Sequence, residues 1–584
     1  MKVTGSQIII KMLELYGIKT VAGIPGGSIL PLYNELCKSS IKHILVRQEQ
    51  SAGFIAQGIA RTTGLPAICM ATSGPGAMNL LTSIADARCD SIPIIAITGQ
   101  VNSYLIGTDA FQEADTFGLS FPITKHSIAI KKAEELLTAI PEAFKIAMNG
   151  RPGPVLIDIP RDIQMAEIEI DSFPNKDVFN SNEQIRFESN AEEISEKTNK
   201  SFELIKESQK PVLYVGGGAN SSISSKVLRE FKKLVRMPVV SSLMGIGCIS
   251  KDDCDYVGMV GMHGSYAANY AMYESDLVIA AGVRFDDRAT GIVTKFCPNA
   301  KIIHIDIDAA EINKILTSQV SFVSKVETVI PLLNKKIMDN KKELTNSEEN
   351  KNNWANKILD ISKNSFSELC GSPNKDGQNS YNEFINPRTF IKNVPSLAKE
   401  VGLNEDKIIV TTDVGQHQMF TAQYYPVKEP RTFLTSGSLG TMGFGLPTAI
   451  GAAIANPDKR IICFSGDGSI MMNIQELITL AENNLPVTVI IFINGTLGMV
   501  YQQQKYLFEK NYSASTFEKN ADYLKIAEGF GIEGTNANTD KDWYKKAFDK
   551  NRKNKPFLVT VNVNHEEDVL PFVPGGKCNI DSIR

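Results

Sequence analysis

Gly466-Asp467-Gly468-Ser469, followed after a second apolar run by Asn494, is the most informative feature of this sequence. Its order predicts a strand, a tight glycine turn, a helix and another strand, which is one βαβ unit. Asp467 and Asn494 lie 27 positions apart (494 − 467), which brings both to one edge of a parallel sheet. A carboxylate, an amide oxygen and a nearby backbone carbonyl suit Mg²⁺ beside a diphosphate. A plain glycine turn with a surface asparagine is the alternative interpretation.

Two further regions of the chain have the same character. Apolar, glycine-punctuated runs alternate with helical patterns, which predicts an α/β protein of doubly wound parallel sheets. At 584 residues the chain is too long for one core. We expect domains at 1–170, 190–340 and 387–564, a linker at 341–386 and a tail at 565–584. The expected strands are 67–71, 93–97, 211–215, 277–281, 301–307, 407–411, 460–464, 487–493 and 557–563.

The composition of the chain limits the kinds of partner that it is expected to bind and the compartment in which it is expected. The net charge of −4 gives no reason to expect a nucleic acid or a membrane. The first residues, 1–17, predict an amphipathic helix with Thr4 as N-cap and not a signal peptide. Nine scattered cysteines without a CxxC pair predict buried, unreactive thiols in a reducing compartment, the cytoplasm.

The first region offers a carboxylate for acid–base chemistry. Glu49 follows the strand-like run 44–46, so it is expected at a strand's carboxyl end. Gly466-Asp467-Gly468 with the spaced Asn494 resembles the thiamine-diphosphate motif, and beside that cofactor such a carboxylate would tune the aminopyrimidine ring by hydrogen bonding. A surface carboxylate is the alternative. Two glycine loops, 23–28 and 73–76, permit close backbone approach to a ligand or are tight turns only.

Further candidate binding residues lie in two loops of the third region and at three strand ends of the middle region. Residues 412–417 end a strand and present backbone N–H groups and His417 to a diphosphate. Met442 stands among glycines in 437–445 and either packs against something flat or is a core methionine. The middle strand ends carry the parts of a dinucleotide site without GxGxxG: 216–218, 282–288 and 304–308.

With these residues assembled, the chain resembles the catalytic subunits of acetohydroxyacid synthases, also called acetolactate synthases. The resemblance covers nearly the whole chain. It rests on GIPGGSILPLYNEL (23–36), TSGPGAMNL (72–80), ITGQVNSYLIGTDAFQEAD (97–115), RPGPVLIDIPRD (151–162), GMHGSYAAN (261–269), GVRFDDRATG (282–291) and SLGTMGFGLP (438–447).

The resemblance implies pyrimidine-binding, FAD-binding and diphosphate-binding domains, and a homodimer with shared active sites. Pyruvate would be decarboxylated on thiamine diphosphate, and the hydroxyethyl unit passed to pyruvate or 2-ketobutyrate. FAD has no net redox role in this family, and a small regulatory subunit is a usual partner. The implied pathway is branched-chain amino-acid biosynthesis.

The resemblance also implies a role for each matching residue. Glu49 activates the cofactor, Arg288 pairs with the second keto acid, and Met442 wedges the bent cofactor. The reacting centre is lined by Gly26, Gly27, Phe111 and Gln112. The metal ligands are Asp467, Asn494 and the Thr496 carbonyl. The thiamine diphosphate contacts are Val414, Gly415, Gln416, His417, Gly440, Met442, Gly468 and Ser469. The FAD contacts are Arg151, Gly217, His263, Gly264, Gly282, Arg284 and Asp306.

The chain departs from the family pattern at three positions. Gln48 replaces a common histidine, Ile493 a common asparagine, and Gln503 a tryptophan that helps select 2-ketobutyrate. This combination resembles the isozyme I type. We expect weak discrimination toward 2-ketobutyrate, because the indole surface that would bury its extra methyl group is missing.

Other functions stay open on the sequence. Another thiamine-dependent carboligase or decarboxylase, or an FAD-dependent pyruvate oxidase, is the main alternative, which Arg288 and GTDAFQE argue against. A catalytically silent nucleotide-binding subunit is a second alternative, opposed by the presence of Glu49, Asp467 and Asn494 together.

Overall fold

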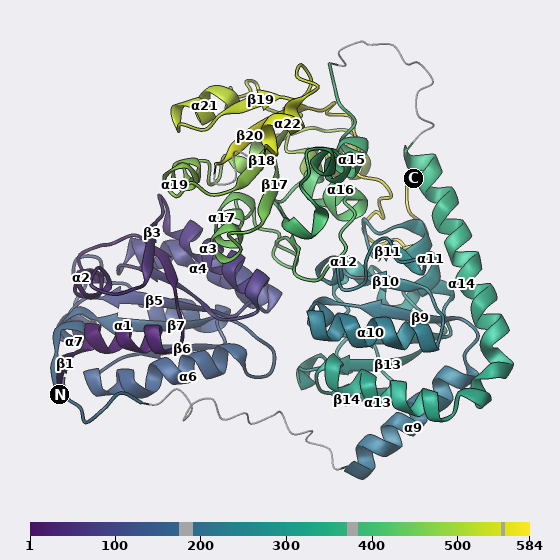
Figure 1. Ribbon diagram of the computed structural model, residues 1–584, viewed down its shortest axis with the longest axis horizontal. Coiled ribbons are helices and arrows are strands. Elements are labelled where there is room, and N and C mark those ends of the chain that lie inside the picture. The colour runs from purple at the N-terminus through teal and green to yellow at the C-terminus, as the bar shows by residue number, and fades with distance from the viewer. Residues whose placement is uncertain (175–190, 371–382, 550–554) are drawn as a thin grey trace.

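Three six-stranded parallel sheets, one for each expected region, form the protein (Figure 1). The computed structural model describes residues 1–174, 191–370, 383–549 and 555–584. Helices cover the sheets, and the predicted α/β class is confirmed. The inner strands are almost continuously buried, as expected for parallel sheets enclosed on both faces.

The first sheet has the order β3-β2-β4-β5-β7-β6. The predicted N-cap is confirmed, because the Thr4 hydroxyl accepts from the Gln7 amide in a capping box. The helix was predicted to begin at residue 1, but it begins at Gly5. Lys2–Thr4 instead form a strand paired with Glu167–Glu169. The elements of this domain are β1 (Lys2–Thr4), α1 (Gly5–Leu15), β2 (Thr20–Gly23), α2 (Leu30–Leu36), β3 (Lys42–Leu45), α3 (Glu49–Thr63), β4 (Ala67–Ala71), α4 (Pro75–Asp90), β5 (Ile94–Gln100), α5 (Thr116–Ser120), β6 (His126–Ala129), α6 (Leu136–Met148), β7 (Val155–Pro160), α7 (Arg161–Met165) and β8 (Glu167–Glu169).

The central sheet has a different order, β11-β10-β9-β12-β13-β14. The order in which successive strands are added across the sheet reverses between β9 and β12. Open α/β sheets bind dinucleotides at such a reversal of strand order. Its elements are α9 (Ala191–Glu207), β9 (Pro211–Val215), α10 (Ser222–Leu234), β10 (Val239–Ser241), β11 (Tyr256–Met259), α11 (Tyr266–Glu274), β12 (Leu277–Ala281), α12 (Asp287–Thr290), β13 (Lys301–Asp306), β14 (Val320–Val323) and α13 (Val326–Asp339).

The third sheet has the order β16-β15-β17-β18-β20-β19, which repeats the first sheet strand for strand along the chain. Its elements are α15 (Pro387–Glu400), β15 (Ile408–Thr412), α16 (Gln416–Tyr424), β16 (Phe433–Leu434), α17 (Gly445–Ala455), β17 (Arg460–Gly466), α18 (Asp467–Ile470), α19 (Glu476–Glu482), β18 (Val487–Ile493), α20 (Gly498–Leu507), α21 (Tyr523–Gly529), β19 (Gly534–Asn536), α22 (Trp543–Ala547) and β20 (Phe557–Asn562).

Helices α3 and α17 join the first and third domains (Figure 1). Gly58 of α3 lies so close to α17 that a Cβ there would meet the Thr448 carbonyl at 2.2 Å, and Gly451 approaches the Ile55 carbonyl in the same way. Close backbone approach of this kind requires glycine. The interface is therefore tight, and it fixes the two domains relative to each other.

The expected linker contains a long helix, α14 (Lys341–Cys370), which runs along the central domain (Figure 1). Trp354 is buried in the central core, and its indole N–H donates to the Pro211 carbonyl at 3.1 Å. The segment 371–382 and most of the polar stretch after 170 lie outside the described residues.

Two further predictions concern the cysteines and membrane-spanning helices. The cysteines described are all free, but Cys37 and Cys254 are exposed, so the prediction that the thiols are buried is wrong for these two. Within the described ranges, no helix is both long and apolar enough to cross a bilayer.

Candidate active site

Asp467 and Asn494 meet at the carboxyl ends of β17 and β18, as the opening sequence motif predicts. One carboxylate oxygen of Asp467 accepts from the backbone N–H groups of Asn494 (3.0 Å) and Gly495 (2.7 Å). The other accepts from Gly468 at 3.0 Å. The Asn494 carboxamide oxygen accepts from the Thr496 amide at 3.0 Å, which turns residues 494–496 around the carboxylate.

The donor set at this turn fits a hard divalent cation. Burial raises the pKa of Asp467 to about 6, although the N–H groups of Gly495, Asn494 and Gly468 oppose that shift. A bound divalent cation would favour the ionised form. The buried Thr496 hydroxyl has no hydrogen-bond partner among the described residues. A carboxylate, an amide oxygen and this turn are therefore suited to Mg²⁺.

Gln416 and His417 form the wall opposite Asp467. The Gln416 amide oxygen accepts from the Asn494 carboxamide at 3.2 Å, and its N–H₂ donates to Gln502 and to the Glu567 carbonyl. Burial lowers the pKa of His417 to about 3, so its ring is neutral, and its Nε2 is buried without a partner in the described chain. An unsatisfied buried group needs an explanation, and a diphosphate oxygen would supply one.

The start of helix α16 adds backbone donors to this wall. Gly415 adopts a φ of +151°, and Val414 precedes it at the end of β15. On the other side Gly468 and Ser469 begin α18, where the Ser469 hydroxyl accepts from the Gly466 amide. Two helices thus start at the carboxyl ends of the neighbouring strands β15 and β17, and helix N-termini favour anions.

The loop that carries Gly440 and Met442 is held by a carboxylate that the sequence did not single out. Asp413 accepts from the amides of Val414 and Gly443, both at 2.8 Å, and burial raises its pKa to about 6. Gly440 has a φ of +66°, which favours glycine. Met442 is half-buried.

Glu49 begins helix α3, and its partners come from its own domain. The carboxylate accepts from the Asn79 amide at 2.9 Å, and a Cβ at Gly76 would lie 3.4 Å from it. Burial and the charge of Glu49 both raise the pKa of Tyr33. The side-chain oxygen of Gln48 is buried without a described partner. Glu49 is thus placed by α4 and remains open to a ligand.

Gln112, Phe111 and Gly27 lie on loops of the same domain. Gln112 has a φ of +59°, and its backbone packs against Gly74. Phe111 is 88% exposed, and a Cβ at Gly27 would meet nothing within 4 Å. Of these predicted lining residues, Phe111 and Gly27 therefore face open space in the single chain, and Gln112 is half-buried.

Arg288 lies elsewhere, on α12 of the central domain. Its side chain is 70% exposed and reaches the Met262 sulfur at 3.9 Å. The tail covers α12, because Asn579 donates to the Ala289 carbonyl at 2.8 Å and Val573 donates to the Met262 carbonyl. The tail therefore packs against the helix that carries Arg288, which belongs to a different domain from Glu49.

The predicted FAD residues gather at the carboxyl end of the central sheet. Gly217 follows β9, Gly282 follows β12, and Asp306 ends β13, so they flank the reversal in strand order. His263 and Gly264 follow β11. Burial lowers the pKa of His263 to about 4, and its Nδ1 is buried without a partner in the described residues. Glycines, an acidic strand end and an unsatisfied ring nitrogen fit a dinucleotide.

Two predicted FAD ligands instead join domains in this structure. Arg151 pairs with Glu311 at 2.8 Å and with Asp308 at 3.4 Å. Arg284 donates to the Cys89 carbonyl at 2.8 Å and to the Ser438 hydroxyl. Both guanidinium groups therefore already have partners across a domain boundary.

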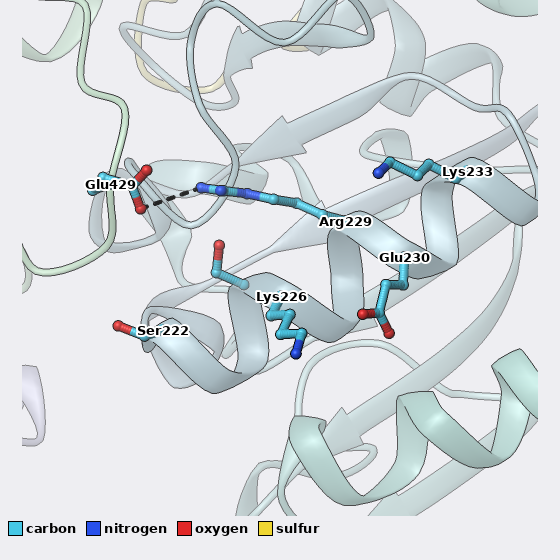
Figure 2. A pocket seen from close by; sticks show the side chains of 7 residues that line it. Ser222, Lys226, Arg229, Glu230, Lys233 and Glu429 are labelled. Atoms are coloured by element: carbon cyan, nitrogen blue, oxygen red, sulfur yellow. Dashed lines mark ion pairs between the residues drawn. The ribbon is translucent and has the colours of Figure 1, made fainter.

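A polar hollow of about 240 Å³ lies beside α10, where Arg229 pairs with Glu429 at 3.6 Å (Figure 2). Its lining is polar and mostly exposed, although Ser225 is buried, and none of the lining residues belongs to the predicted site. The ion pair links the central and third domains, and such exposed pairs contribute little stability.

Three family models match successive parts of this chain. They are described as thiamine pyrophosphate enzyme domains: the N-terminal TPP binding domain at residues 3–119, the central domain at 198–333, and the C-terminal TPP binding domain at 413–561.

Curated relatives match over almost the full length. The chain is 45% identical to the acetolactate synthase isozyme 1 large subunit of Escherichia coli, over 99% of this chain and 97% of the relative. It is 41% identical to isozyme 2 of the same organism, over 99% of each chain. It is also 41% identical to a probable acetolactate synthase large subunit of Methanocaldococcus jannaschii, over 98% and 94%.

Proposed function

Because the chain belongs to the acetolactate synthase large subunits of the thiamine pyrophosphate enzyme family, we propose that it joins pyruvate to a second 2-keto acid at the Asp467 turn. The observation that carries this proposal is the meeting of Asp467, Asn494 and the unsatisfied His417 ring at the ends of three neighbouring strands, β17, β18 and β15. The products are 2-acetolactate from pyruvate and 2-aceto-2-hydroxybutyrate from 2-ketobutyrate, in branched-chain amino-acid biosynthesis.

Thiamine diphosphate, when bound, supplies an electron sink for decarboxylation of pyruvate. Asp467, Asn494 and the Thr496 carbonyl would hold Mg²⁺, which would supply positive charge for the diphosphate. His417 and the amides at Gly415, Gly468 and Ser469 bind the diphosphate oxygens. Gly440 and Met442 orient the aminopyrimidine ring. The donor chemistry of the Asp467 turn supports this assignment.

Glu49 would hold a proton at the aminopyrimidine ring nitrogen, and that hydrogen bond would favour the imino form of the ring, which can accept a proton. Its contact with Asn79 supports this role, because one oxygen is oriented while the side chain stays accessible. Phe111 and Gln112 exclude water from the reacting carbons, which prevents simple protonation. Arg288 binds the carboxylate of the second keto acid through a bidentate pair.

FAD binding at the central sheet is part of the proposal. Gly217, Gly282 and Asp306 at the strand reversal support it, as does the unsatisfied nitrogen of His263. Arg151 and Arg284 reach FAD only by exchanging their present partners. The flavin has no redox step in this scheme.

A second copy of the chain completes the site in this proposal. Exposed apolar side chains of the Glu49 domain support a homodimer: Tyr104, Ile106, Phe111 and Phe121 are between 53% and 88% exposed. Apolar surface of this kind is typical of an interface. A small regulatory subunit and a reducing, cytoplasmic location, which suits the free cysteines, complete the proposal.

The test is acetolactate formation by the purified protein with pyruvate, thiamine diphosphate, Mg²⁺ and FAD, leaving out each component in turn. We expect product only when thiamine diphosphate and Mg²⁺ are both present. Release of acetaldehyde or consumption of oxygen as the main result would instead assign the chain to a decarboxylase or an oxidase.

A further inference from the structure

A buried ionic cluster connects α3 and α4 of the first domain. The Arg61 guanidinium lies 2.8 Å from the Asp90 carboxylate and 3.3 Å from that of Asp86, and it also donates to the Gln57 amide oxygen. All three charged side chains are at most 9% exposed. Burying charges is costly unless every one of them is paired and hydrogen-bonded.

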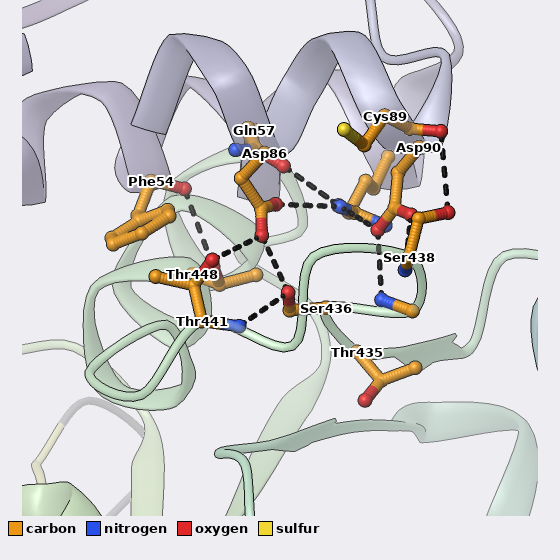
Figure 3. A network of polar contacts seen from close by, with 12 residues as sticks. Phe54, Gln57, Asp86, Cys89, Asp90, Thr435, Ser436, Ser438, Thr441 and Thr448 are labelled. Atoms are coloured by element: carbon orange, nitrogen blue, oxygen red, sulfur yellow. Dashed lines mark hydrogen bonds and ion pairs between the residues drawn. The ribbon is translucent and has the colours of Figure 1, made fainter. Parts of the chain in front are cut away.

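The two carboxylates of this cluster also bind one loop of the third domain, residues 436–444 (Figure 3). Asp86 accepts from the hydroxyls of Ser436 and Thr441, the latter at 2.8 Å. Asp90 accepts from the backbone amides of Gly437 and Ser438, both at 2.9 Å. The two carboxylates thus bind the loop both before and after Gly440.

The loop closes on itself around these contacts. The Thr441 amide donates to the Ser436 hydroxyl at 2.9 Å, so that hydroxyl bridges the loop and Asp86. Phe444, at the loop's end, packs under the Arg61 guanidinium, whose central carbon lies 4.9 Å from the ring centroid. Arg284 of the central domain also reaches Ser438, so three domains meet at this loop.

We propose that Arg61, Asp86 and Asp90 are positioning residues that hold the 436–444 loop in the conformation that receives the aminopyrimidine ring. The inference rests on the proposed function, because that function places Gly440 and Met442 against the ring. Carboxylates that bind amides and hydroxyls on both sides of Gly440 leave the intervening residues little freedom. The loop is then ordered before the cofactor arrives, and binding does not have to order it.

The electrostatics of the cluster agree with this role. Burial opposes ionisation of Asp90, but Arg61 and the Gly437 and Ser438 contacts lower its pKa overall. Burial and the charge of Asp90 raise the pKa of Asp86. Arg61 and the hydroxyls of Ser436 and Thr441 then stabilise the charge of Asp86, which is the less favourable of the two charges. Both of these hydroxyls belong to the loop.

Two variants remove loop contacts and leave the carboxylates in place: Ser436→Ala and Thr441→Val. The matched control is Thr448→Val, because the Thr448 hydroxyl is buried at the same domain interface and donates to the Phe54 carbonyl instead (Figure 3). The measurements are amide hydrogen exchange of residues 437–442 in cofactor-free protein, the dissociation constant of thiamine diphosphate, and kcat at saturating cofactor.

We expect both loop variants to speed exchange of the loop amides and to raise the dissociation constant about tenfold each, since each loses a hydrogen bond to a charged group. With saturating cofactor, kcat should stay within about twofold of the parent, and the control should change neither exchange nor affinity. Exchange and affinity equal to those of the control would overturn the proposal. If the parent binds no thiamine diphosphate, the proposed function fails, while the loop exchange still decides whether Asp86 fixes the loop.

Discussion

Replacing Asp467 by asparagine tests the proposed metal site most directly. The two oxygens of the Asp467 carboxylate accept hydrogen bonds from three backbone N–H groups, those of Asn494, Gly495 and Gly468. An amide has one acceptor oxygen. If that oxygen keeps the Asn494 and Gly495 contacts, the amide N–H₂ faces the Gly468 N–H, and two donors oppose each other.

The magnitude follows from these contacts. Losing a hydrogen bond to a charged group costs about 1.5–3 kcal/mol, and the cation also loses its only carboxylate in the proposed donor set. We therefore expect the Mg²⁺ concentration for half-activation to rise at least about 100-fold, which corresponds to about 2.7 kcal/mol. The assay is acetolactate formation against Mg²⁺ concentration at saturating pyruvate and thiamine diphosphate.

The control is Asp522→Asn, which removes an exposed carboxylate of the same domain that caps α21 and pairs with Lys525. It should leave the Mg²⁺ dependence unchanged. A half-activating concentration for the Asp467 variant within about twofold of the parent would refute the assignment of this carboxylate as a ligand.

Three further predictions test other residues. Glu49→Gln should lower kcat at least about 100-fold while the affinity for thiamine diphosphate is retained; turnover within tenfold of the parent, by the same acetolactate assay, would remove its proton-holding role. Gln503→Trp, at an exposed position on α20, should raise the preference for 2-ketobutyrate roughly tenfold in a competition assay, and an unchanged product ratio would contradict the hypothesis. Burial raises the pKa of Asp158 to about 7, above its ordinary 3.8, against the opposing bonds from Thr98 and Gln100. Its contribution to stability is therefore full below about pH 4 and is lost as the pH rises through about 7, by up to about 4 kcal/mol. Asp158→Asn should remove that loss, so urea unfolding at about pH 5 and about pH 8 should show a smaller difference in the variant than in the parent; an equal difference would disprove the sign.

The interior strands could be predicted because their signal is local. Runs such as Ala67–Ala71 and Val487–Ile493 are buried on both faces, and a continuous apolar run bounded by turn residues records that burial. The strand Lys2–Thr4 could not be predicted in this way. Its partner, Glu167–Glu169, is far along the chain, and pairing of that kind leaves no local pattern.

The same distinction holds for the site. Asp467 and Asn494 lie within one βαβ unit, so their spacing alone indicated that they would meet. Asp86 and Asp90 lie on a helix, where charged residues ordinarily face water. Their partners, Ser436 and Ser438, are about 350 positions later. Only the tertiary structure reveals that these charges are buried and satisfied.

The equal strand order of the first and third sheets has a consequence for the origin of the enzyme. In each sheet, glycine turns follow the first and third strands along the chain, and the long helix after the second strand is α3 in one and α17 in the other. Duplication of one ancestral gene segment would leave this correspondence, with the paired helices as the old interface between two equal halves. The halves would then have diverged around a cofactor with unlike ends, and in the proposed function one half supplies a carboxylate for the ring and the other a carboxylate for the metal.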